Sequence, residues 1–151
     1  MDKLVITATT DSTGSYPRNP YLTPCTDYEG VAKEYIRCLN AGATIVHTHG
    51  SYAHDPIIQS DGRKLSIPDL NGWREITERI RSVANPIMQF GMASVRLEQK
   101  LELWETLSPD MSSINFNSHD EYFQPDPDYP PFSVYSVHPI PELREYCGLA
   151  K

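Results

Sequence analysis

Cysteine is scarce in this sequence, and its few cysteines fit no metal or redox spacing. Cys25, Cys38 and Cys147 are the three thiols among 151 residues, an odd number spread widely along the chain. Zinc-binding or redox cysteines usually stand close together in a recognisable motif. Scattered thiols are instead typical of reduced cysteines in a cytoplasm, and we therefore expect a cytoplasmic protein.

Long apolar runs and an excess of positive charge are missing as well. No run of about 18 apolar residues occurs, so the sequence predicts no membrane-spanning helix. Lysine and arginine number 13 against 20 aspartate and glutamate residues, a formal net charge of −7. Nucleic-acid binding needs a basic surface, which this balance does not favour. Neither a membrane nor a nucleic acid is therefore expected as a partner.

What the chain does contain is a regular alternation of strand-like and helix-like segments. Segments without a helical period predict strands at residues 4–10, 44–49, 86–91 and 112–117. Apolar residues at helical spacing predict helices at residues 26–41, 68–85, 96–107 and from 140 onward. The polar stretch around Asp61 and the proline-rich stretch 124–131 predict loops. This order predicts an α/β fold with a parallel sheet covered by helices.

The number of strand–helix (βα) units indicates how much of a barrel the chain contains. Four βα units are half of a (β/α)8 barrel, which typically needs about 250 residues. We therefore expect one (β/α) domain over residues 1–151 that corresponds to the N-terminal half of a barrel. A complete four-stranded open sheet is the alternative, and it would leave two sheet edges to protect.

Particular residues predict where the helices begin and which faces turn inward. Thr26, with Glu29 three residues later, predicts a capping box at the start of the first helix. Helical spacing predicts that the second helix buries one apolar stripe made of Trp73, Ile76, Ile80 and Val83. By the same argument the third helix buries Leu97, Leu101 and Trp104.

Polar residues gather at one end of all four predicted strands. Residues two apart in a strand share a face, so one face carries Thr7, Thr9 and Asp11, then Ile45, His47 and His49, then Ile87, Gln89 and Gly91, and finally Ser113, Asn115 and Asn117. A parallel sheet covered on both sides is normally almost entirely apolar. In (β/α) barrels the active site lies at the C-terminal ends of the strands. The pattern therefore predicts a functional site at this end of the sheet.

His47 and His49 are the natural metal ligands of this site. Two imidazoles at positions i and i+2 of one strand can bind a single ion, and catalytic zinc usually takes three protein ligands. The third ligand is not evident from spacing, and the candidates are His54, His119, His138, Asp11, Asp55 and Asp120. The alternative is that both histidines are hydrogen-bonded residues with a structural role.

Thr9, Asp11 and Asn115 are candidate substrate contacts at the ends of the outer strands. An asparagine there can bind a carboxylate or a carbonyl group, although a buried polar layer is the rival interpretation. Threonine is also an ordinary strand former, so its presence alone does not distinguish binding from structure.

The stretches "LVITATTDSTG", "NPYLTPCT" and "AGATIVHTHG" resemble the β-keto acid cleavage enzymes, the family of the 3-keto-5-aminohexanoate cleavage enzyme of lysine degradation. The resemblance implies a (β/α)8 barrel and a divalent metal, usually zinc, bound by His47 and His49. It implies that a β-keto acid and acetyl-CoA give acetoacetate and a new CoA thioester, in a homo-oligomeric enzyme. Gln89 and Asn115 would line the substrate pocket.

The sequence departs from the family pattern at several places. The segment after the histidines reads "GSYAHDP" instead of an Arg-Asp pair, and the segment at residues 90–94 reads "FGMAS" where the family tends toward "STGG". The family's third metal ligand, a glutamate, and its catalytic arginine and aspartate belong to the second half of the barrel. Two other interpretations remain: a zinc hydrolase of the amidohydrolase type, and a non-catalytic half-barrel. The amidohydrolases normally carry the motif on the first strand.

Overall fold

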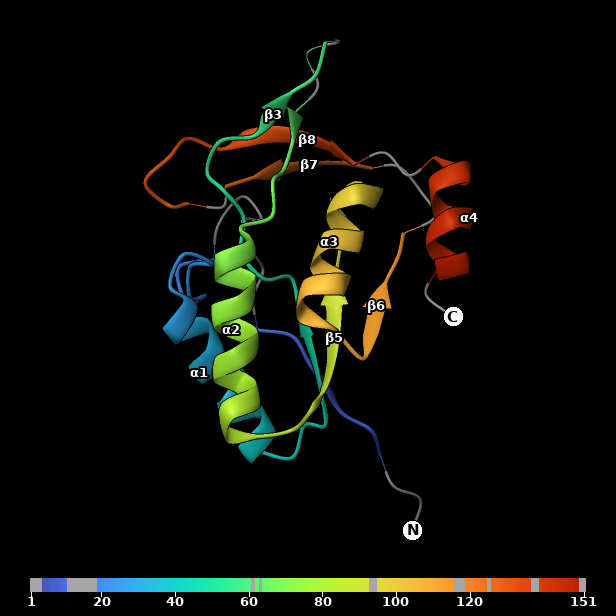
Figure 1. Cartoon of the computed structure of the whole chain (residues 1–151). Coiled ribbons are helices and arrows are strands. Elements are labelled where there is room, and N and C mark those ends of the chain that lie inside the picture. The colour runs from blue at the N-terminus through green and yellow to red at the C-terminus, as the bar shows by residue number, and fades with distance from the viewer. Residues whose placement is uncertain are drawn as a thin grey trace.

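The computed structural model describes residues 4–10, 19–60, 62, 64–92, 95–115, 119–124, 126–136 and 139–149. Over these residues the chain is a mixed α/β fold in which parallel strands alternate with helices (Figure 1). The expected α/β class is therefore confirmed.

A four-stranded parallel sheet forms the centre of the fold. Its strands are β1 (Thr7–Ala8), β2 (Ile45–Thr48), β5 (Ile87–Gly91) and β6 (Met111–Ser113), in the spatial order β1-β2-β5-β6. Each strand therefore lies beside the strand that precedes it in the parallel sheet, as in a (β/α) barrel. The outer strands are shorter than the sequence predicts, and the regular pairing ends before Thr9 and before Asn115.

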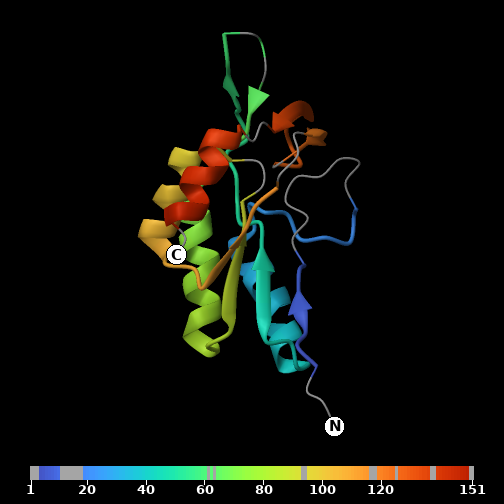
Figure 2. The same ribbon diagram turned by 90° about the vertical axis from the view of Figure 1, so that its right-hand side faces the viewer.

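Helices cover one face of this sheet. These are α1 (Tyr28–Asn40), α2 (Leu70–Val83), α3 (Leu97–Leu107) and α4 (Ile140–Leu149). Figure 2 shows α2, α3 and α4 on one side of the strands, and α1 packs beside α2. On the other face, Ile87 and Met111 are each more than two fifths exposed. Among the described residues, no helix is long and apolar enough to cross a membrane.

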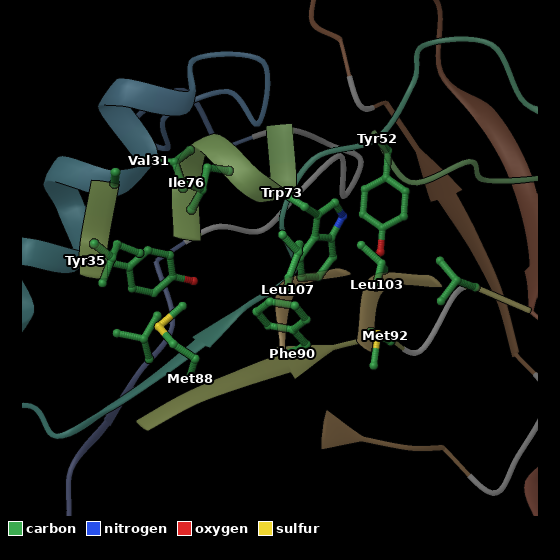
Figure 3. Packing of buried hydrophobic residues seen from close by; sticks show 14 of the residues in the cluster. Val31, Tyr35, Tyr52, Trp73, Ile76, Met88, Phe90, Met92, Leu103 and Leu107 are labelled. Atoms are coloured by element: carbon green, nitrogen blue, oxygen red, sulfur yellow. The ribbon is translucent and has the colours of Figure 1, made fainter. Parts of the chain in front are cut away.

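The hydrophobic core lies between the sheet and its helices (Figure 3). Val46, Met88 and Phe90 project from the strands into this layer and are fully buried, as their alternation with the polar residues predicts. The ring of Trp73 from α2 packs against Phe90 with centroids 4.7 Å apart. Complete burial of one such side chain stabilises a fold by about 1.5–3 kcal/mol. This layer gives the strands a rigid support on their helical side.

Two local expectations about the helices are wrong. The N-cap of α1 is Asp27, whose side chain accepts a hydrogen bond from the Gly30 amide at 2.9 Å, so the helix begins after Asp27 and not after Thr26. Val83 is the last residue of α2 and is 62% exposed, so it does not belong to the buried stripe. The inward face of α3 is set by Leu97, Lys100, Leu103 and Leu107, with Leu101 and Trp104 partly buried beside it.

Two antiparallel hairpins add to the predicted elements, one within the polar stretch around residue 61 and one whose strands lie on either side of the predicted proline-rich loop 124–131. They are β3 (Ile57–Ile58) with β4 (Lys64–Leu65), and β7 (His119–Phe123) with β8 (Phe132–Ser136). Both lie beyond the C-terminal ends of β2 and β5, where β4 contacts β8 (Figure 1). The hairpins therefore stand over the end of the sheet at which the polar residues gather.

Candidate functional site

At the polar end of the sheet, two pairs of residues on neighbouring strands lie in register. His47 of β2 lies opposite Gln89 of β5, and Gly91 of β5 lies opposite Ser113 of β6. Side chains of parallel neighbours in register point to the same face. Because Met88 and Phe90 turn toward the helices, Gln89 and Gly91 lie on the face that the helices leave uncovered.

The two imidazoles converge above Gly91. The ring centroids of His47 and His49 are 4.8 Å apart, with an edge-to-face angle of 79°. An ideal Cβ atom built on Gly91 would be 2.9 Å from Nε2 of His47 and 3.0 Å from Nε2 of His49. Both nitrogens therefore lie beside one point on the sheet surface, which a side chain at residue 91 would fill.

His47 is held at its backbone and at its ring. Its Nδ1 atom is 2.8 Å from the Oε1 atom of Gln89. Its carbonyl oxygen accepts a hydrogen bond from the Tyr35 hydroxyl at 2.7 Å, and Tyr35 belongs to α1 in the core. Sequence periodicity assigns Tyr35 to the buried face of its helix, but it does not show that the hydroxyl reaches the strand that carries the ligand candidate.

The turn that follows His49 is packed tightly against the core. Gly50 has a φ angle of +67°, and its amide donates to Oγ1 of Thr48 at 3.0 Å. An ideal Cβ atom at Gly50 would be 2.1 Å from two ring atoms of Trp73. Glycine is needed here both for the backbone conformation and for the close approach of the indole.

A second polar cluster links the start of α1 to the start of α2. The Tyr28 hydroxyl donates to Oδ2 of Asp69, while Oδ1 of Asp69 caps α2 by accepting from the Asn71 amide at 3.2 Å. The hydrogen bond to Asp69, with burial and the negative charge of the carboxylate, raises the pKa of Tyr28 to about 12. Tyr28 thus remains protonated at ordinary pH and connects the two helices.

The structure describes only some of the other candidate residues. Thr9 and Asn115 are exposed, just beyond β1 and β6. His54 stacks on Tyr129 with ring centroids 4.1 Å apart, and its Nε2 is 3.0 Å from Asp55. Of the remaining candidates, Asp11, Asn117 and His138 are not described, and the structure describes only the backbone of His119 and Asp120.

The donor chemistry of the two imidazoles fits a metal ion. Two neutral imidazole nitrogens on one strand are common ligands of zinc and of other divalent transition metals. Within the described residues, however, no group of three histidine, cysteine, aspartate or glutamate side chains is gathered. Of the candidates for the third ligand, His54 and Asp55 are described and are not gathered with both His47 and His49.

The comparisons with known proteins agree with this arrangement. The family model of the beta-keto acid cleavage enzymes matches residues 3–136, which include the whole parallel sheet. No curated protein matches the chain. A match over this much of the chain shows the family, so the chain belongs to the beta-keto acid cleavage enzymes.

Proposed function

We propose that this chain contributes to a metal-dependent β-keto acid cleavage enzyme in which His47 and His49 are two of the metal ligands. The observation that carries the proposal is the convergence of their Nε2 atoms above Gly91, on the uncovered face of the sheet. Family membership supports it, because the family is generally metal-dependent. The zinc hydrolase alternative is less favoured, because His47 lies on the second strand of the sheet and His49 directly follows that strand, whereas the motif of the amidohydrolases normally belongs to the first strand.

The reaction we propose is an exchange between a β-keto acid and acetyl-CoA that yields acetoacetate and a new CoA thioester. A bound zinc or other divalent ion would polarise the keto group and stabilise negative charge during carbon–carbon bond cleavage. His47 and His49 would hold the ion through neutral imidazole nitrogens. We propose Thr9, Asp11 and Asn115 as substrate contacts at the ends of the outer strands.

The remaining parts of the site would come from a closed barrel. Ile87 is 43% exposed and Met111 is 42% exposed on the face that no described helix covers. In a (β/α)8 barrel such residues are buried in the interior by the strands opposite. We propose that residues 1–151 are the N-terminal half of a barrel of this kind, in a homo-oligomer. The third metal ligand would then lie outside the described residues.

Metal content per chain tests the proposal. A size-fractionated sample of the wild-type chain should contain nearly one equivalent of divalent metal, and His47→Ala and His49→Ala should each lose it. His54→Ala is the matched control, because His54 stacks on Tyr129 away from the two ligand candidates and its replacement should leave the metal in place. A well-folded wild-type chain that binds no added zinc would contradict the proposal.

An activity assay separates the remaining chemical alternatives. Any consumption of β-keto acids by a sample that binds metal should depend on added acetyl-CoA, and acetoacetate should appear in equal amount. Metal-dependent hydrolysis without acetyl-CoA would instead favour the zinc hydrolase.

A further inference from the structure

We propose that Gln89 is a positioning residue that holds His47 in the tautomer able to bind metal, and that its side-chain oxygen is not a substrate contact. This inference rests on the proposed function as far as the metal is concerned. It assigns a role to Gln89 that differs from the substrate contact implied by the sequence resemblance.

The first step is the fixed relationship between the two residues. His47 and Gln89 are paired in register on hydrogen-bonded parallel strands, and the Nδ1 and Oε1 atoms are 2.8 Å apart. Both neighbours of Gln89 in the strand, Met88 and Phe90, are fully buried. Asp110 also holds β5 in place, because its carboxylate accepts a hydrogen bond from the Met88 backbone amide at 2.8 Å. The backbone that carries Gln89 therefore has little freedom to move.

The second step is the proton position that this contact requires. The amide oxygen of glutamine can only accept a hydrogen bond, and a neutral imidazole carries one proton, on either Nδ1 or Nε2. The contact with Oε1 places the proton on Nδ1 of His47. The lone pair of Nε2 is then available for a ligand bond. In the opposite tautomer Nε2 would carry the proton and could not bind a metal.

The third step is the direction in which Nε2 of His47 points. It lies 2.9 Å from the ideal Cβ position of Gly91, and Nε2 of His49 lies 3.0 Å from the same position. Gln89 thus holds one nitrogen of His47 while the other nitrogen faces the shared point. Metal-binding histidines commonly donate their second N–H to a carboxylate or a carbonyl oxygen that fixes the ring in this way.

The same contact argues against substrate binding by the Gln89 oxygen. An oxygen that accepts the Nδ1 proton of His47 lies against the imidazole ring, and turning it toward a substrate would break that hydrogen bond. Breaking it would leave a part-buried imidazole N–H without its acceptor, which is unfavourable. Gln89 therefore acts through His47.

Nitrogen NMR of the metal-free chain tests the tautomer directly. At pH 8, above the ordinary imidazole pKa of about 6.5, the wild-type chain labelled with 15N-histidine should show His47 with a protonated Nδ1 and an unprotonated Nε2. Gln89→Leu removes the acceptor at similar size, and His47 should then populate both tautomers. Gln89→Glu keeps an acceptor and should restore the single tautomer.

Zinc affinity measured by competition with a chelator provides the second readout. Loss of such a supporting hydrogen bond typically weakens metal binding by about 10- to 100-fold, and we expect this for Gln89→Leu. Gln89→Glu should bind zinc at least as tightly as the wild type. Met111→Leu is the matched control, because Met111 pairs in register with Gln89 from the other neighbouring strand and should leave both readouts unchanged.

The outcomes separate this inference from the proposed function. A wild-type His47 protonated on Nε2 overturns the inference without any variant, even if Gln89→Leu fails to fold. Wild-type zinc affinity in a folded Gln89→Leu chain also overturns it. If the wild-type chain binds no zinc, the proposed function fails, while a His47 tautomer that depends on Gln89 in the metal-free chain still supports the positioning role.

Discussion

Gly91 lies directly against His49: a Cβ atom at Gly91 would stand 2.7 Å from Cδ2 of that imidazole. Real Cβ atoms essentially never approach another heavy atom so closely. The φ angle of Gly91 is not positive, so its backbone conformation does not demand glycine. Glycine is required at residue 91 because the two imidazole rings project into the space that a side chain would occupy.

Gly91→Ala is therefore expected to displace the rings and weaken metal binding while the fold is kept. We expect zinc affinity to fall at least about tenfold, comparable with the loss of other groups that support metal ligands. Chelator competition measures it, and circular dichroism checks the fold. Gly148→Ala is the control, since nothing lies within 4 Å of a Cβ atom at that residue. Unchanged affinity in Gly91→Ala would show that the rings do not need this space.

Gly50→Ala is expected to destabilise the whole domain. An alanine with a φ angle of +67° would adopt an unfavourable left-handed backbone conformation, and its Cβ atom would overlap the ring of Trp73. Each effect costs about 1–3 kcal/mol in free energy of unfolding. Gly62→Ala is the control, because its φ of +84° is also positive but nothing lies within 4 Å of the added Cβ atom. Urea unfolding should show a clearly larger loss of stability for Gly50→Ala than for Gly62→Ala, and equal losses would contradict the overlap with Trp73.

Tyr28 is expected to make the domain sensitive to alkaline pH. Its pKa is raised to about 12 by the hydrogen bond to Asp69, by burial and by the charge of that carboxylate, against about 10 in an unfolded chain. Between these values the folded state binds more protons than the unfolded state, so stability is complete below pH 10 and falls as pH rises toward 12.

Tyr28→Phe should reduce this loss of stability between pH 10 and 12. Urea unfolding at pH 8, 10 and 11.5 measures the slope, with Tyr21→Phe as the control at a tyrosine that is 93% exposed. An alkaline slope that is the same in Tyr28→Phe and in the wild type would contradict the role of the hydrogen bond to Asp69.

Lys100 is expected to lower the stability of the domain at neutral pH. It is only 4% exposed on α3, and burial is the main cause that lowers the pKa of its ammonium group. The unfolded state then binds the proton more tightly, so stability rises with pH until the unfolded lysine also deprotonates near pH 10.5. The Tyr146 ring, 5.6 Å from Nζ, offsets only part of this burial cost.

Lys100→Met should therefore stabilise the chain at pH 7, with a gain that shrinks as pH approaches 10.5. Thermal unfolding at pH 7 and pH 10 measures it. Lys33→Met is the control, because Lys33 is largely exposed beside Glu29 and should change stability by less than about 1 kcal/mol. A marked loss of stability in Lys100→Met at pH 7 would show that the charge is favourable in its site.

The alternation of elements and the face that each strand turns to the helices were determined by the sequence itself. Trp73, Ile76 and Ile80 recur at helical spacing, and all three are fully buried on α2. Val46, Met88 and Phe90 alternate with His47 and Gln89, and all three face the core. These features follow from local periods of 3.6 and 2.0 residues, which neighbouring residues along the chain suffice to specify.

The tertiary structure alone decided which residues meet at the end of the sheet. His47 and Gln89 are 42 residues apart, and only the register of β2 against β5 brings their side chains together. The requirement for glycine at residue 91 likewise comes from imidazoles on the neighbouring strand.

The hairpins and the inward position of Lys100 also escaped the local pattern. β3 and β4 pair within a polar stretch for which the sequence predicts a loop. β7 and β8 lie on either side of the predicted proline-rich loop, and their strand character depends on pairing with each other and on the contact of β4 with β8. Lysine is a charged residue type that local patterns place at the surface, but Lys100 is buried between α3 and α4, where the long apolar part of its side chain packs. Local periodicity determines which face of each element is apolar, whereas contacts between distant segments determine which polar groups are held together.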